Sequence, residues 1–77
     1  SPWGLFITED QSLFMTDGYN NRVLKMNLDG QILGSLGEHG KLPGQFELCH
    51  HLSIGPITKS LYVGEITNWR VQKFLPR

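Results

Sequence analysis

Histidine, cysteine and tyrosine are the side chains of this 77-residue sequence that could bind a metal or transfer a proton. His50 is the leading candidate, because it alternates with Leu52 and Ile54 and so shares one face of an expected strand. Three imidazoles with an open fourth position are the ligand set of many catalytic zinc sites. One His50 per chain completes such a set only when other copies contribute theirs. The alternative is a histidine that hydrogen-bonds to backbone or water.

The residues near His50 have simpler expected roles. His51 follows it directly and is expected on the opposite face of the strand, packed between sheets. Cys49 is the only cysteine, so the chain cannot form an internal disulfide, and we expect a buried thiol rather than a metal ligand. His39 lies in a glycine-rich stretch and is expected to be solvated.

Tyr19 and two acid–arginine sets lie at expected turns. Tyr19 could act as a proton donor or acceptor, or simply cover a neighbouring sheet as a turn aromatic. Each set has an acid, an asparagine and an arginine, and a catalytic residue rarely recurs in every repeat, so we expect turn clamps. The sets are Asp17, Asn20 and Arg22, and Glu65, Asn68 and Arg70.

The two sets belong to an internal repeat that must position all of these side chains. A shift of 48 residues places 13–26 on 61–74 with five identities in 14 positions. Upstream, a shift of 47 aligns Leu5 with Leu52 and Ile7 with Ile54. A period of this length is typical of one four-stranded propeller blade with its connection.

Each copy has the pattern of a short antiparallel sheet. Apolar residues alternate or cluster in short runs, which Gly, Pro, Asn and Asp separate. No sustained helical stripe is present. The expected strands are Trp3–Thr8, Leu13–Thr16, Arg22–Met26, Gln31–Leu36, His50–Gly55, Leu61–Gly64 and Arg70–Phe74. Asp29-Gly30 predicts a two-residue hairpin turn, and Phe46 is expected to anchor the connecting loop in a core.

The phrases DGYNNRVLKMNLDGQILGSLG, PGQFELCHHLSIG and LYVGEITNWRVQKF together resemble two consecutive NHL repeats. NHL repeats form β-propellers, typically six-bladed, whose innermost strands line a central channel. The resemblance implies an all-β fold with blades at 1–36 and 48–77, joined by a loop at 37–47. The second blade would lack its outer strand. Trp3 and His50 occupy equivalent positions and are implied to line the channel and contact a ligand.

Within this superfamily the phrasing is similar to that of the peptidyl-α-hydroxyglycine α-amidating lyases. Their active-site tyrosine, in an Asp-Gly-Tyr motif, matches Tyr19, and their zinc-binding histidine matches His50. The resemblance implies Tyr19 as a catalytic residue and His50 as a metal ligand, with zinc or calcium as the cofactor. The arginine that follows the acidic residue in the next blade of these enzymes is Ile66 here.

Two blades do not close a ring, because each blade buries both faces against neighbours. Leaving two apolar faces in water would cost more than the stability of about 5 kcal/mol expected of so small a domain. The sequence therefore predicts either a homotrimer that completes six blades or a piece of a longer propeller. We expect a non-enzymatic scaffold for a peptide, protein or small ligand; the alternative is a metal-dependent lyase.

Charge and hydropathy limit the classes of partner that the chain is expected to bind. Seven basic and seven acidic residues balance, so the sequence lacks the basic patch that nucleic-acid binding needs. No apolar run approaches the length of a membrane span and no charged leader precedes one, so we expect a soluble chain without a signal peptide. The glycines of GSLGEHG follow a strand and open no helix, unlike a nucleotide-binding loop.

Overall fold

The computed structural model describes residues 2–76 and consists of two antiparallel sheets and a short parallel pair of strands. The first sheet contains β1 (Pro2–Ile7), β2 (Leu13–Asp17), β3 (Arg22–Met26) and β4 (Ile32–Leu36) in chain order. The second contains β7 (Cys49–Ile54), β8 (Leu61–Glu65) and β9 (Arg70–Phe74). The parallel pair is β5 (Glu38–His39) and β6 (Gln45–Phe46). The expected all-β class is confirmed.

Most of the expected elements agree with the structure to within one residue. The two short strands of the connection raise the expected count from seven to nine, and the only helical element within residues 2–76 is the 3-10 turn η1 (Gly18–Asn20). None of the described residues forms a helix long and apolar enough to cross a membrane.

The predicted two-residue turn at Asp29-Gly30 is wrong in length. Asn27 N donates to Gln31 O over 3.0 Å, which leaves the three-residue loop Leu28–Gly30 between β3 and β4. Gly30 ends the loop at φ +87°, a left-handed conformation that glycine adopts without steric cost. A hairpin of this kind adds one residue beyond the tightest turn.

The first three strands of the two sheets have the same register. Gly4 pairs with Thr16 as His51 pairs with Gly64, and each first strand has a bulge one residue earlier, at Trp3 and at His50. Backbone conformation follows the repeat as well, since Asn21 and Trp69 share a left-handed φ, as do Gln11 and Lys59. The sequence repeat is therefore a structural repeat.

Alternation along the strands gives each sheet two faces, here called face A and face B. In the first sheet, face A carries Leu5, Ile7, Leu13, Met15, Leu24 and Met26, and face B carries Gly4, Phe6, Phe14, Thr16, Val23 and Lys25. In the second sheet, the repeat places Leu52, Ile54, Leu61, Val63, Gln72 and Phe74 on face A, and His51, Ser53, Tyr62, Gly64, Val71 and Lys73 on face B.

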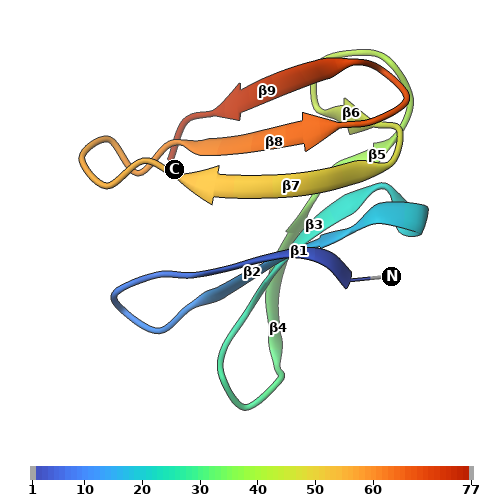
Figure 1. The fold of residues 1–77 in the computed structure, drawn as a ribbon. Coiled ribbons are helices and arrows are strands. Elements are labelled where there is room, and N and C mark those ends of the chain that lie inside the picture. Colours follow the sequence, from blue (N-terminus) through green and yellow to red (C-terminus); the bar gives the residue numbers. More distant parts are fainter. Residues whose placement is uncertain (1, 77) are drawn as a thin grey trace.

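The second sheet packs over the first with β7 above β1 (Figure 1). Face B of the first sheet meets face A of the second, and Val23, Phe46, Cys49 and Val63 form the buried core between them. Phe46 is fully buried, as expected for an anchor of the connecting loop. The Cys49 thiol is also buried as expected, and burial raises its pKa to about 11.

The two sheets approach most closely where β1 and β7 begin. Thr16 Oγ1 donates a hydrogen bond to His50 O over 2.7 Å, so the two strands are joined there. A Cβ atom on Gly4 would lie 2.5 Å from the same carbonyl oxygen, which is closer than non-bonded atoms allow. Glycine at this position therefore permits the contact between the strands.

Candidate functional site

Four ring side chains meet at the start of β1 and β7, and we call them the ring cluster: Trp3, Tyr19, His50 and His51. The centroid of the Trp3 ring lies 4.9 Å from that of Tyr19, edge to face, and 5.1 Å from that of His50. The rings of His50 and His51 have centroids 4.4 Å apart. The structure thus brings Tyr19 to the ring of Trp3, which also contacts His50, the residue that the sequence analysis had paired with Trp3.

Two β-bulges place these rings. Trp3 and His50 are the extra residues at which the register shifts in β1 and β7. A bulge interrupts the alternation of side chains along a strand. The expectation that His51 faces away from His50 is therefore wrong, since their Nδ1 atoms lie 2.7 Å apart.

The contact between the two histidines gives their facing nitrogens opposite hydrogen-bonding roles. A hydrogen bond between two ring nitrogens needs one N–H donor and one lone-pair acceptor. One of the two facing Nδ1 atoms therefore donates in this contact and the other accepts. His51 is exposed and His50 is half-buried, so the pair lies at the surface.

Tyr19 reaches the cluster because η1 begins with a glycine. A Cβ atom on Gly18 would lie 2.6 Å from Cε3 of Trp3, so any larger residue would displace the indole. Tyr19 remains 67% exposed, with one edge of its ring on Trp3. The second copy has Ile66 and Thr67 at the equivalent positions, so only the first copy has this arrangement.

The part of the chain that the structure describes does not form a complete metal site. Among residues 2–76, no group of three or more His, Cys, Asp or Glu side chains is arranged to hold an ion. Cys49 Sγ lies 3.4 Å from the carbonyl oxygen of Arg22 inside the core. A zinc site at His50 would therefore need ligands from further copies or further chain. His39, expected to be solvated, is exposed and lies 3.1 Å from Glu47.

The acid–asparagine–arginine set of the first sheet closes the turn between β2 and β3. Asn20 Nδ2 donates to both carboxylate oxygens of Asp17, over 3.1 and 2.9 Å. Arg22 Nε donates to Asp17 Oδ2 over 3.0 Å. Asn21, the residue between them, has the left-handed backbone that completes the reversal.

The set of the second sheet repeats this geometry around Glu65. Asn68 Nδ2 and Arg70 Nε donate to the two oxygens of the Glu65 carboxylate, over 2.8 and 2.5 Å. Burial raises the pKa of Glu65, but hydrogen bonds from Arg70, Asn68 and Gln72 outweigh it, so the pKa is lowered. Glu65 is therefore an ion at neutral pH in a nearly buried position.

Arg70 has a second role that the sequence did not reveal. Its Nη groups donate to the carbonyl oxygens of Lys41, Leu42 and Gln45, so it holds the loop 40–47 against the sheet. Gln72 adds a hydrogen bond to Gln45 O over 2.7 Å. The recurrence of arginine predicted a clamp within the turn; the loop contacts depend on how the chain folds back.

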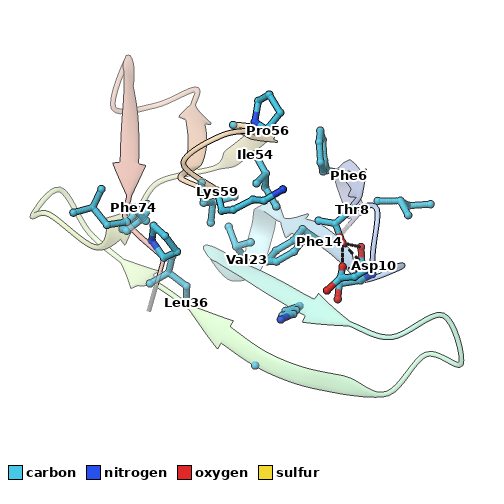
Figure 2. Close-up of a pocket in the computed structure, with 18 of the residues that line it drawn as sticks. Phe6, Thr8, Asp10, Phe14, Val23, Leu36, Ile54, Pro56, Lys59 and Phe74 are labelled. Carbon is cyan, nitrogen blue, oxygen red and sulfur yellow. Dashed lines mark hydrogen bonds between the residues drawn. The ribbon is translucent and has the colours of Figure 1, made fainter.

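A cleft of about 1140 Å³ lies between the sheets (Figure 2). Phe6 and Phe14 from the first sheet and Ile54 and Phe74 from the second make its walls apolar. Charged residues also line the cleft, among them Lys59 and Asp10. The sequence did not predict this cleft, because its width depends on the angle between the sheets.

Known proteins are similar to this chain in sequence. No protein-family model matches the chain. NHL repeat-containing protein 3 is 29% identical over 77 residues in both Mus musculus and Homo sapiens, covering 96% of this chain and 22% of the relative. The peptidyl-glycine alpha-amidating monooxygenase of Mus musculus is 32% identical over 68 residues, covering 82% of this chain and 7% of the relative.

These similarities agree with the geometry described above. The chain spans less than a quarter of the length of each of these relatives, so they match it as a segment. Both kinds of relative align with a chain whose two sheets repeat one register and one pair of turns. The chain is thus related to the NHL-repeat proteins.

Proposed function

We propose that the chain is a propeller module that closes into a homotrimeric ring and serves as a binding scaffold for a peptide, protein or small ligand. The observation that carries the proposal is the orientation of the two sheets. Face B of the first sheet meets face A of the second, so the repeats pack head to tail. Head-to-tail contacts form closed rings when the rotation between units closes.

The free face A of the first sheet has the composition of an interface. Its residues on β1, β2 and β3 are apolar, and Leu5 and Ile7 on β1 are 63% and 60% exposed, whereas Leu24 on β3 is buried. Ile32 on β4 extends the same apolar surface, paired with Met26. Apolar surface of this kind is typical of association sites. The exposed apolar surface of face A therefore supports an interface in which another copy covers these side chains.

The free face B of the second sheet matches the face already buried inside the chain. Tyr62, Val71 and Lys73 correspond to Phe14, Val23 and Lys25 of the first sheet. The contact between a lysine and an aromatic ring also recurs. Lys25 Nζ lies 5.8 Å from the centroid of the Phe14 ring, and Lys73 Nζ lies 5.9 Å from that of the Tyr62 ring. This recurrence supports the proposal that copies meet as the two sheets do.

Three copies would give the six blades typical of the NHL propellers that the sequence resembles. In such a ring the first strands β1 and β7 would line the channel, and Trp3 and His50 would face a ligand there. The ring cluster offers flat aromatic surfaces and hydrogen-bonding nitrogens at one site. These groups suit a peptide or another ligand with both apolar and polar parts.

The mass of the protein in solution tests the ring. Light scattering should give three times the mass of the chain, and Leu5→Lys should dissociate the trimer because it buries a charge in the interface. Leu28→Lys is the matched control, since Leu28 is exposed in the β3–β4 loop and outside both faces. A folded wild-type monomer at high concentration would refute the ring.

The alternative function, a metal-dependent lyase, is supported by one feature of the site. Trp3 contacts both Tyr19 and His50, which the resemblance implies as acid–base residue and metal ligand. In a three-fold ring each copy would contribute one His50. Metal analysis of the purified protein should then find zinc or calcium, and His50→Ala should abolish this metal binding. If the protein has no bound metal and binds none when metal is added, the lyase is excluded and the scaffold remains as the proposed function.

A further inference from the structure

Arg22 and Arg70 occupy equivalent turns, but their surroundings differ. The Arg70 side chain is 28% exposed and its Nη groups hold three carbonyl oxygens of the loop 40–47. The Arg22 side chain is 43% exposed, and within residues 2–76 its guanidinium hydrogen-bonds only to Asp17, through Nε. Within residues 2–76 the first sheet therefore has the same arginine without a loop like the one that the second sheet binds.

We propose that Arg22, Asn20 and the adjoining face A form a binding site for a segment of a separate polypeptide with the pattern of Lys41–Phe46. The ligand class is a peptide whose Pro-Gly turn presents several backbone carbonyls and is followed shortly by an aromatic residue. The precedent is the loop 40–47 on the second sheet. The inference rests on the packing of the repeat and does not require the trimer.

The polar half of the site already has suitable donors. A guanidinium carries five N–H groups, and within residues 2–76 the bond to Asp17 uses the one on Nε, so the four on the Nη atoms can donate to a ligand. Asn68 shows how the asparagine contributes, because its Nδ2 donates to Gly40 O over 3.0 Å as well as to Glu65. Asn20 occupies the same position beside Arg22, but its Nδ2 donates to both oxygens of Asp17, so a ligand carbonyl would take the place of one of these bonds.

The apolar half of the site accepts the aromatic residue. Phe46 lies against Phe74, with ring centroids 5.8 Å apart, and packs in one cluster with Val63. Met26 and Met15 hold the equivalent positions on face A of the first sheet. Methionine side chains adapt their shape to a neighbouring ring. A phenylalanine of the ligand would thus find an apolar surface at the expected distance from the arginine.

One substitution makes the external site weaker than the internal one. Gln72 exchanges two hydrogen bonds with the loop, accepting from Gly44 N and donating to Gln45 O. Leu24 replaces it in the first sheet and can form neither bond. A ligand therefore depends on Arg22 for its carbonyls and on its aromatic residue for burial, and these two features set specificity.

The test uses a labelled peptide with the sequence of residues 38–48, EHGKLPGQFEL, added to the intact protein and followed by fluorescence anisotropy. Saturable binding is expected. Arg22→Lys should weaken it at least about tenfold, because lysine loses the planar fork that binds several carbonyls. A peptide with alanine for its phenylalanine should not bind. Lys59→Gln removes a cation in the β7–β8 loop and should leave the affinity unchanged.

Absence of saturable binding to folded protein, or equal affinity for wild type and Arg22→Lys, would overturn the inference. If Arg22→Lys fails to fold, the methyl resonances of Met15 and Met26 decide instead, because the peptide should shift both. Light scattering on the same samples separates this inference from the ring. Peptide binding by protein that stays monomeric at high concentration would refute the ring alone, and a trimer that does not bind the peptide would refute the site alone.

Discussion

Single residues decide where the chemistry of this chain lies. The bulges at Trp3 and His50 turn one ring from each sheet toward the same point, and Gly18 leaves room for the indole beneath Tyr19. Gly18 is an isoleucine in the second copy, so the repeat could not form the same cluster twice. The bulges recur in both copies, whereas the small residue that completes the site occurs in one.

Gly4→Ala should destabilise the protein. Its Cβ would lie 2.5 Å from His50 O and 2.9 Å from Thr16 Oγ1, so β1 and β7 must separate or the Thr16 bond must break. Overpacking of this kind costs about 1–3 kcal/mol, measurable as a lower urea midpoint. Gly34→Ala is the matched control, since no atom lies within 4 Å of its Cβ position. Equal midpoints for the two variants would contradict the close approach.

Glu65 should make stability depend on pH in the acid range. Its pKa in the folded protein is below the ordinary value of 4.5, so the carboxylate contributes stability that is present above that value and lost as pH falls through the lower folded pKa. Urea unfolding from pH 6 to pH 3 should show this loss. Glu65→Gln should flatten the decline, while Glu9→Gln, an exposed acid in the β1–β2 loop, should not.

At the scale of elements, an arginine binds a loop to a sheet. The loop 40–47 has only the two-residue strand β6 and the turn at Gly44, so its backbone needs partners from elsewhere. Arg70 and Gln72 supply them from β9, and Phe46 anchors the end of the loop in the core. The loop is thus part of the second sheet's structure and not a passive linker.

Arg70→Ala should release this loop, with a loss of about 2–3 kcal/mol of stability because several charge-assisted hydrogen bonds disappear. Hydrogen exchange at residues 41–46 should increase more than in the strands. Arg22→Ala offers a comparison within the same molecule, since that arginine bonds to Asp17 alone among the described residues. Its effect should be clearly smaller. Similar losses for both arginines would show that the loop contacts add little.

The sequence predicted the strands well because alternation and turn residues are local signals. It missed β5 and β6, whose pairing depends on the loop folding back onto the sheet. It identified Trp3, Tyr19 and His50, but their contact with each other requires the packing of two sheets. The orientation of His51 was wrong because nothing in Cys-His-His-Leu indicates a bulge.

At the scale of the whole molecule, two copies of one repeat unit pack together. The two outer surfaces that they leave are different, face A of the first sheet and face B of the second. The internal interface has advantages that a contact between copies would lack. Gly4 lets the strands approach and Thr16 bonds to His50 O, whereas His51 and Gly64 hold these positions on the outer face of the second sheet. Association should therefore be weaker than the packing inside the chain and should depend on concentration.

His51→Gly should strengthen the proposed trimer. In a ring whose copies meet as the two sheets do, His51 would lie where Gly4 lies, so its side chain would meet the backbone of β1 in the next copy. In the internal interface even a β-carbon on Gly4 would be too close to the facing strand. The imidazole of His51 is larger, so it would fit less well at the equivalent position between copies. Removing the side chain should lower the concentration at which trimers form by about tenfold or more, as relief of overpacking would give.

Sedimentation velocity over a range of concentrations measures this shift. Ser53→Gly is the matched control, because Ser53 lies on the same face of β7 and is also exposed, but corresponds to Phe6, where the internal interface leaves room for a side chain. Both variants lose a side chain from a strand, so a gain in assembly that only His51→Gly shows would come from the interface. Unchanged or weaker assembly of folded His51→Gly would mean that copies do not meet as the two sheets do, and the ring would need a different geometry.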